Sequence, residues 1–122
     1  MEEIVLATIG EELEKLEVTY EYGEFKGLPT FPYARGEYSE NQYTFETNGT
    51  SGEFILTCFN HGSELDLIEL KDKIKKHFRD YRRVTEKGGI SIKYRNSLFV
   101  QTGDEQLRRR EIYLEIQYWE SE

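Results

Sequence analysis

Apolar residues in the middle of the chain change their spacing, from a run typical of a strand to the steps of three and four typical of a helix. Residues 54–59 (FILTCF) carry no charge and are largely aromatic or β-branched, so they predict a strand with one or both faces covered. The apolar positions that follow predict one buried side of a helix. They are Leu67, Leu70, Ile74, Phe78 and Tyr81.

Sequence signals also mark the ends of this helix. Ser63 can accept a hydrogen bond from the first helical turn, and Asp66 can reach back as in a capping box. We expect the helix to carry basic residues on its other sides as far as Arg83, before the Gly88–Gly89 pair interrupts the chain. The helix is therefore predicted to be amphipathic.

Shorter patterns predict the remaining elements. An apolar stripe with helical spacing covers residues 1–16. Alternating apolar and polar residues predict strands near 18–22, 31–38, 90–95 and 111–118. In the second of these strands, Pro32 suggests an edge strand or an irregular start.

The order of these elements predicts an α+β fold in a single domain, residues 1–122. Because the strands are grouped rather than alternating with helices, we expect a mainly antiparallel sheet of four to five strands with two helices packed on one face. Flexible loops are expected near residues 40–52, where Asn48–Gly49 is a turn signal, and near residues 96–108. Within the second loop, Leu98–Val100 form either a short strand or an apolar tip.

Composition predicts a soluble, single-domain protein. Its 122 residues suffice for one hydrophobic core, and 33% charged residues imply a well solvated exterior. No apolar run approaches the roughly 18 residues that span a membrane, and the N-terminus lacks the basic region of a secretory signal. We therefore expect no membrane partner and a cytosolic compartment, which agrees with the single cysteine, Cys58.

Charge is distributed unevenly along the chain, whose formal net charge is -8. Residues 1–66 hold three Lys or Arg against fourteen Asp or Glu, a net charge of -11, whereas residues 67–122 hold thirteen against ten, a net charge of +3. If the asymmetry persists in the folded protein, acidic and basic faces of neighbouring copies can meet head to tail in rings or filaments. The alternative is that both are solvated faces. An acidic chain with interleaved charges is a poor candidate for binding nucleic acid.

No catalytic, cofactor-binding or metal site is predicted. Cys58 and His61 have a spacing that suits a metal, but His77 is the sole further Cys or His. A nucleophilic Cys58 needs an exposed thiolate beside a base, whereas its apolar strand predicts a buried, unreactive thiol. The 24 acidic residues single out no acid–base pair, and the Gly88–Gly89 pair lacks the lysine and the strand-to-helix context of a phosphate loop. We therefore expect a protein that is not an enzyme.

Three segments of the chain show a distinctive order of elements: FPYARGEYSE (31–40), GEFILTCFNHGSELDLIELKDKIKKHF (52–78) and YRNSLFVQTGDEQLRRREIYLEIQYWE (94–120). With them, the layout of nearly the whole chain resembles the tail terminator, or tail completion, proteins of long-tailed bacteriophages and prophages. Members of this family place an aromatic, proline-containing strand before a variable loop, then an apolar strand, a lysine-rich helix and a last strand ending in a Trp–Glu pair such as Trp119–Glu120.

The resemblance implies a small α+β subunit of the virion tail, made and assembled in the cytoplasm of a bacterial host. It implies a homo-oligomer, a hexameric ring on the end of the tail tube, that stops polymerisation of the tube protein. The ring would also offer a docking surface to a head-completion or connector protein.

Two sets of residues are expected to form interfaces in such a role. Aromatic side chains are expected anchors, because they dominate the binding energy of many interfaces. They are Tyr33, Tyr38, Tyr43, Phe45 and Phe99. A basic surface is expected to contact an acidic surface of a neighbouring subunit or of the tail tube. It comprises Lys73, Lys76, Arg79 and Arg83 on the helix, with Arg108, Arg109 and Arg110 before the last strand.

A small acidic binding module, such as an immunity or inhibitor protein that acts as a monomer, is the alternative function. The acidic, tyrosine-rich first half of the chain suits it, because charge complementarity speeds association with a basic target. The basic helix of the second half does not suit it.

Overall fold

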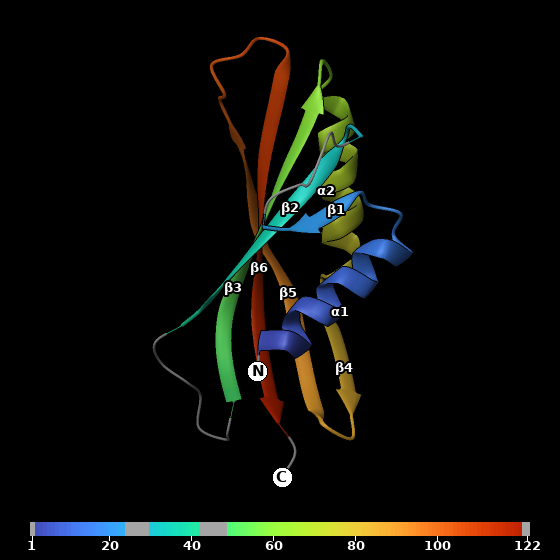
Figure 1. Cartoon of the computed structure of the whole chain (residues 1–122), viewed down its shortest axis with the longest axis vertical. Helices are drawn as coiled ribbons and strands as arrows, with labels where there is room; N and C mark the ends of the chain where they lie inside the picture. The colour runs from blue at the N-terminus through green and yellow to red at the C-terminus, as the bar shows by residue number, and fades with distance from the viewer. Residues whose placement is uncertain (1, 24–29, 42–48, 121–122) are drawn as a thin grey trace.

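The chain folds into two helices and six strands in the computed structural model, which describes residues 2–23, 30–41 and 49–120. In chain order the elements are α1 (Glu2–Lys15), β1 (Tyr20–Tyr22), β2 (Tyr33–Glu40), β3 (Gly49–His61), α2 (Leu65–His77), β4 (Tyr81–Thr85), β5 (Gly88–Val100) and β6 (Leu107–Glu120). The strands form one sheet in the order β1-β2-β3-β6-β5-β4, curled into a half-barrel (Figure 1). Strand β1 runs parallel to β2, and every other neighbouring pair is antiparallel.

The predicted sheet of four to five mainly antiparallel strands is wrong, because the sheet is mixed and has six strands, although the fold is α+β. One source of the error is the region after α2. Tyr81 continues the helical spacing of Ile74 and Phe78, and its ring lies 5.6 Å from the Phe78 ring, but it belongs to β4. The helix has already ended at His77, where the Phe78 N–H donates to the Ile74 carbonyl. Tyr81 thus contacts the core at a position that suits a helix, although the helix has already ended.

The start of α2 also differs from the predicted capping box. Glu64 is the cap residue and its side chain makes no capping hydrogen bond. The Ser63 hydroxyl accepts a hydrogen bond from the Leu65 N–H at 3.2 Å. Asp66 instead accepts a hydrogen bond from the Asn60 side-chain amide at 3.2 Å. The hydrogen bond between Asn60 and Asp66 therefore joins the helix to the end of β3.

The expected loop over residues 40–52 is partly strand. β2 extends to Glu40, and β3 begins at Gly49. Gly49 and Gly52 are both buried within the sheet, so the end of this segment contributes to the folded core. Residues 42–48, which include the Asn48 turn signal, lie outside the described residues.

The expected loop over residues 96–108 is mostly strand as well. Residues Asn96–Val100 continue β5 beyond an irregularity in register at Tyr94, and Leu107 already belongs to β6. Residues 101–106 are therefore the whole connection between the two strands. Of the two alternatives for Leu98–Val100, the strand is the one observed.

The hydrophobic core lies between the helices and one face of the sheet, termed the helix side (Figure 1). Each helix contributes one buried stripe, because its apolar residues recur at steps of three and four. Buried core residues include Val5, Ile9 and Leu13 of α1, Leu67, Leu70 and Ile74 of α2, and Phe54, Leu56, Cys58, Ile90, Ile92, Ile112, Leu114 and Ile116 of the sheet. Intervening strand residues point to the opposite face. This open face is not covered by either described helix (Figure 1).

Gly36 in the sheet and Gly10 in α1 differ in the space around them, and this difference tests how closely the helix side of the sheet is packed. A Cβ atom on Gly36 of β2 would lie 2.5 Å from the Phe54 ring and 2.8 Å from the Tyr20 hydroxyl oxygen. A Cβ atom on Gly10 of α1 would meet no atom within 4 Å. We expect Gly36→Ala to lower the free energy of unfolding by about 1–3 kcal/mol through overpacking.

Gly10→Ala is the matched control, and it should raise the free energy of unfolding by about 0.5–1 kcal/mol because alanine favours a helix. Urea unfolding followed by circular dichroism measures both changes. A Gly36→Ala protein at least as stable as the parent would contradict the packing described for Phe54.

Candidate protein-interaction surface

Aromatic and arginine side chains gather on the open face, at the end of the sheet where β5 turns into β6. Cross-strand register creates this cluster, since Tyr33 of β2, Phe59 of β3 and Arg109 of β6 are direct neighbours. The Tyr33 and Phe59 rings stack with centroids 5.1 Å apart. The members of this aromatic–arginine cluster are Phe31, Tyr33, Arg35, Phe59, His61 and Arg109.

The Phe31 ring extends the cluster toward the end of β3. Its centroid lies 5.3 Å from that of Tyr33 and 5.6 Å from that of the exposed His61. Phe31 keeps 42% of its surface exposed, so a large apolar side chain faces solvent here. Exposed aromatic groups of this kind are common at protein interfaces.

Two arginines flank the Phe59 ring. The guanidinium carbons of Arg35 and Arg109 lie 5.6 and 5.8 Å from its centroid, within range of a cation–π interaction. Arg109 also donates to Glu111 at 2.8 Å. The Nε atoms of both arginines are shielded from solvent and have no hydrogen-bond partner among the described residues. Both guanidinium groups therefore lie against an aromatic ring, and each has an Nε–H donor without a partner among the described residues.

Sequence patterns did not reveal Phe31, Arg35, Phe59 and His61 as members of one cluster. Alternation along the strand that starts near Phe31 places Phe31 and Arg35 on the same side, and this alternation is the sequence signal for that part of the cluster. Contact with Phe59 and His61 depends on the register between β2 and β3, which no local pattern contains.

The predicted basic surface is divided between the two ends of α2. Arg108 donates to the Gly62 carbonyl at 3.2 Å and Arg110 pairs with Glu64 at 3.2 Å, both just before the helix begins. Arg79 lies just after its end. A helix of 13 residues is about 20 Å long, so these two groups do not form one patch.

Other basic residues are also separated. Lys73 and Lys76 lie on α2 with exposed side chains. Arg83 belongs to β4 rather than to the helix, and it pairs with Glu11 of α1 at 2.6 Å. Arg109 is on the open face, as its contact with Phe59 shows, whereas Arg110 turns to Glu64 on the helix side.

The predicted aromatic anchors are likewise divided. Tyr33 belongs to the cluster, and Phe99 is 40% exposed on the helix side. Tyr38 faces the helix side, where its ring stacks 6.4 Å from that of Phe54. Tyr43 and Phe45 lie outside the described residues.

The candidate catalytic residues do not meet. Cys58 is completely buried on the helix side, and burial raises the pKa of its thiol to about 12. His61 is on the open face beside Phe31, and the His77 Nε2 atom lies 2.9 Å from Glu12. Within the described ranges, no group of three or more His, Cys, Asp or Glu side chains could hold a metal ion.

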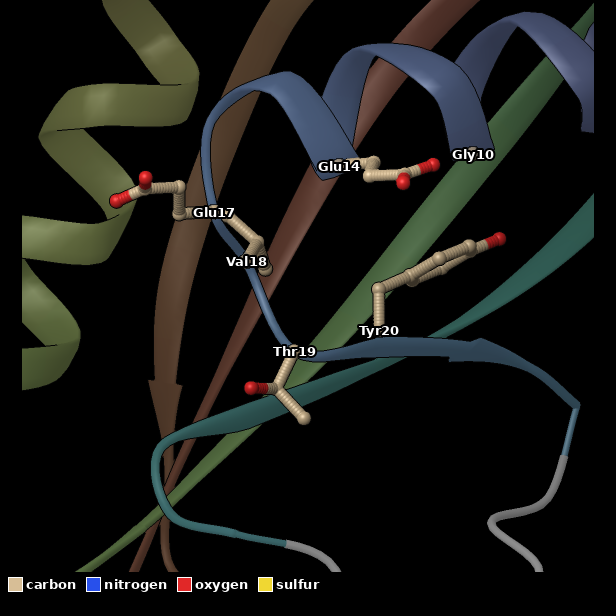
Figure 2. Close-up of a pocket in the computed structure, with 6 residues that line it drawn as sticks. All are labelled: Gly10, Glu14, Glu17, Val18, Thr19 and Tyr20. Carbon is tan, nitrogen blue, oxygen red and sulfur yellow. The ribbon is translucent and has the colours of Figure 1, made fainter.

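A hollow of about 340 Å³ lies between the C-terminal part of α1 and the segment that leads into β1 (Figure 2). Glu14 brings its carboxylate to the hollow, whereas the Glu17 side chain points away from it toward α2, and Gly10 leaves room for the hollow. Burial raises the pKa of Tyr20, whose hydroxyl has no hydrogen-bond partner among the described residues. The hollow pairs no nucleophile with a base, so we assign it no chemistry.

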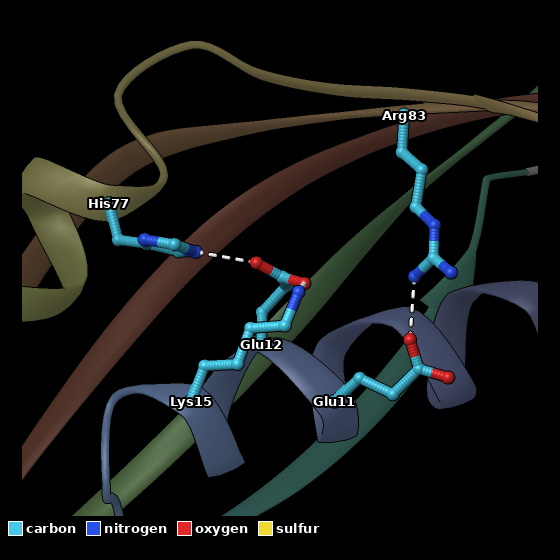
Figure 3. A network of polar contacts seen from close by, with 5 residues as sticks. All are labelled: Glu11, Glu12, Lys15, His77 and Arg83. Carbon is cyan, nitrogen blue, oxygen red and sulfur yellow. Dashed lines mark hydrogen bonds and ion pairs between the residues drawn. The ribbon is translucent and has the colours of Figure 1, made fainter.

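A buried carboxylate connects the two helices (Figure 3). The side chain of Glu12 is 5% exposed and contacts Lys15 Nζ and His77 Nε2, each at 2.9 Å. Burial acts to raise the pKa of Glu12, but the hydrogen bonds to Lys15 and His77 outweigh it, and the pKa is lowered. The neighbouring Glu11 reaches Arg83 of β4. Through the Glu12–His77 and Glu11–Arg83 pairs, this network links α1 to α2 and to the edge strand β4.

Comparison of the sequence with known protein families finds no matching family, and comparison with curated proteins finds no matching relative. No helix of the described chain is both long and apolar enough to cross a membrane. The geometry of the chain and the layout of its sequence are therefore the basis of the functional argument.

The Glu12 contacts predict a specific dependence of stability on pH. Because the pKa of Glu12 is lower in the folded protein than its ordinary value of 4.5, its contacts stabilise the fold above pH 4.5. This stabilisation is lost as the pH falls through the folded pKa. Glu12→Gln should lower the free energy of unfolding by about 1–3 kcal/mol at pH 7, and the difference from the parent should shrink on acidification.

Glu14→Gln is the control, since Glu14 lies exposed on the same helix. Urea unfolding of the parent and both variants at several pH values measures the effect. A Glu12→Gln deficit that stays constant from pH 7 to pH 3 would show that the carboxylate charge is not what stabilises the contact.

Reversal of charge should affect stability differently at the two ends of the expected basic surface. The Arg110 side chain is 14% exposed and bonded to Glu64 and Ser97, so Arg110→Glu should cost about 2–3 kcal/mol of stability. Arg79→Glu alters an exposed residue and should leave stability nearly unchanged. Thermal unfolding of both variants provides the comparison, and equal melting temperatures would argue against the Arg110–Glu64 contact.

Proposed function

We propose that this chain is a structural subunit of a long bacteriophage or prophage tail. Copies of it assemble head to tail into a ring, with six copies expected, that caps the tail tube and stops its polymerisation. The capped end then presents the surface to which a head-completion or connector protein docks. The proposal combines the resemblance in sequence layout with one structural observation, the aromatic–arginine cluster on the open face.

One end of the open face supports an assembly role, because it departs from the polar pattern of a solvated sheet surface. An antiparallel sheet covered on one side normally has polar residues on the other. Here Tyr33 of β2, Phe59 of β3 and Val100 of β5 lie in one cross-strand row at one end of that surface, with Arg109 of β6 between Phe59 and Val100, and Leu98 lies in the next row on this face. Aromatic and arginine side chains are also enriched among residues that dominate binding energy. Such a face is suited to contact another protein.

Capping a polymer requires surfaces rather than a reaction centre. A tube stops growing when its last ring is covered by a subunit that matches it on one side and differs on the other. The described residues offer distinct surfaces, since one side of the sheet is covered by helices and the other is open (Figure 1). A heterologous subunit of this kind can close into a ring.

An acidic binding module remains the second candidate, and one observation favours it. Glu3 and Glu14 lie exposed on α1, and Glu17 is exposed just beyond the helix. A basic partner could be attracted to these carboxylates. This candidate predicts a monomer that needs no tail for its activity.

Deletion of the gene from a phage or prophage that carries it tests the proposal. Without the protein, we expect tails of uncontrolled length that do not join heads, and a plasmid copy of the gene should restore both features. Electron microscopy of the particles measures tail length and the fraction of tails joined to heads. Tails of normal length, joined to heads in the absence of the protein, would refute the proposed function and leave the monomeric binding module as the better candidate.

A further inference from the structure

Strand β5 is longer than its outer neighbour β4, so part of β5 has a strand on one side only. β4 pairs with Gly88–Ile92 of β5, whereas Asn96–Val100 pair with β6 alone among the described strands. Between these two parts, the Tyr94 N–H donates to the Phe78 carbonyl at 2.7 Å. In Figure 1, Asn96–Val100 lead into the hairpin at the top of the view, where no strand lies on their outer side. We call Asn96–Val100 the edge segment.

Backbone groups along the edge segment point alternately toward β6 and away from it. Tyr94 shows how direction and face correspond, since it faces the helix side opposite Leu114 and its N–H points away from β6. The extra residue at the register shift, Arg95, changes both alternations together. Ser97 and Phe99 also face the helix side, so their N–H and C=O groups point away from β6 as well.

These outward groups match one kind of occupant. They belong to residues two apart in a strand, so the two sets of donor and acceptor lie about 7 Å apart. An extended polypeptide offers donors and acceptors at the same repeat, as a strand added to the edge of a sheet does. The edge segment is therefore a position for one more strand.

Side chains of the edge segment favour such pairing. Exposed strand edges are usually protected by charged residues, proline or a bulge. The edge segment (NSLFV) contains no charged residue and no proline, and the register shift lies before it. Leu98 and Phe99 lie on opposite faces and are 41% and 40% exposed. An added strand would therefore cover apolar side chains on both faces as well as the backbone groups.

A second copy of the edge segment is the occupant that fits this geometry. The segment is centred on Leu98, so a two-fold axis beside this residue sets two segments antiparallel over their whole length. Ser97 of one copy then faces Phe99 of the other. Both are outward residues, so each N–H meets the C=O of its opposite residue and all the outward groups of both copies are satisfied.

Side chains and charges are compatible with the same axis. Leu98 of one copy meets Leu98 of the other on the open face, as an apolar cross-strand pair. Two arginines flank the segment, and each is already neutralised within its own chain. Arg95 is paired with Glu53 at 2.7 Å, and Arg110 is paired with Glu64 at 3.2 Å. The contact therefore does not depend on attraction between charges.

We propose that two copies of this chain pair through the edge segment about a two-fold axis beside Leu98, which joins their two sheets into one. This inference goes beyond the proposed function, because the ring requires a head-to-tail contact and the pair does not. An isologous pair uses the edge segment of both copies, so it stops at two. The contact is small, so the dimer should dissociate on dilution.

Opposite charges placed at the axis test this pairing. Leu98→Lys and Leu98→Glu each bring like charges together across the axis, so each variant alone should be a monomer of 14.5 kDa. A 1:1 mixture brings Lys against Glu and should restore a dimer of twice that mass. Val84→Lys is the matched control, since Val84 is 74% exposed on β4, outside the edge segment, and it should dimerise like the parent.

Light scattering from micromolar to millimolar concentration measures the mass of each protein, and melting temperatures confirm that each variant folds. Leu98 is 41% exposed, so either charged side chain can remain solvated in the monomer.

Amide hydrogen exchange locates the contact independently of mass. In the parent, exchange at Ser97 and Phe99 should slow as concentration rises, because their N–H groups gain partners in the dimer. The same amides of the Leu98→Lys protein should exchange at one rate at every concentration. The Leu98 amide points toward β6 in both states, so it is the internal control.

The proposal fails if the parent stays monomeric at millimolar concentration, or if either charged variant dimerises as well as the parent. It also fails if a mixture of the two folded variants stays monomeric. Parental dimers in which exchange at Ser97 and Phe99 is as fast as in the monomer would place the contact elsewhere and overturn it equally.

Discussion

The register between β3 and β6 is the constraint on which the rest of the structure depends. All 13 residues of β3 pair with β6, from Gly49 with Trp119 to His61 with Leu107. This ladder occupies the centre of the sheet and decides which side chains face the helices. A slip by one residue would move every side chain of the moved strand to the other face. Phe54 and Leu56 would leave the core, and the neighbours of Phe59 would change.

The sequence predicts much of the fold because local periodicity records which face of each element is buried. The helix over the first 16 residues, the buried stripe through Leu70 and Ile74, and the last strand all follow from such periods. β4 was missed because Tyr81 maintains core contact at helical spacing outside the helix. The strand character of Gly49–Gly52 was missed because its local composition is that of a turn, while its pairing partners lie in β2 and β6.

The candidate surface was less predictable than the fold, since it depends on pairing between distant segments. Arg108, Arg109 and Arg110 look alike in the sequence, yet strand alternation sends Arg109 to Phe59 and Arg110 to Glu64 on opposite faces. Arg83 was expected on a free basic face but is engaged with Glu11. Tyr33 was identified from its aromatic character alone, whereas its stacking partner Phe59 was recognised only as part of the strand over residues 54–59. The type of a residue identifies a candidate anchor, whereas the register between strands decides on which face of the sheet, and beside which neighbours, that residue lies.

The two edge strands of the sheet limit pairing of its backbone with other chains. An unpaired strand edge is a template for uncontrolled pairing with other chains, which leads to fibrous aggregates. Here one edge strand, β1, is three residues long, and the other, β4, is five residues long and carries Arg82 and Arg83. Short and charged edges resist the indefinite growth of a shared sheet. Apart from Asn96–Val100, side-chain surfaces, rather than backbone edges, are therefore the part of this sheet available for contact with other proteins.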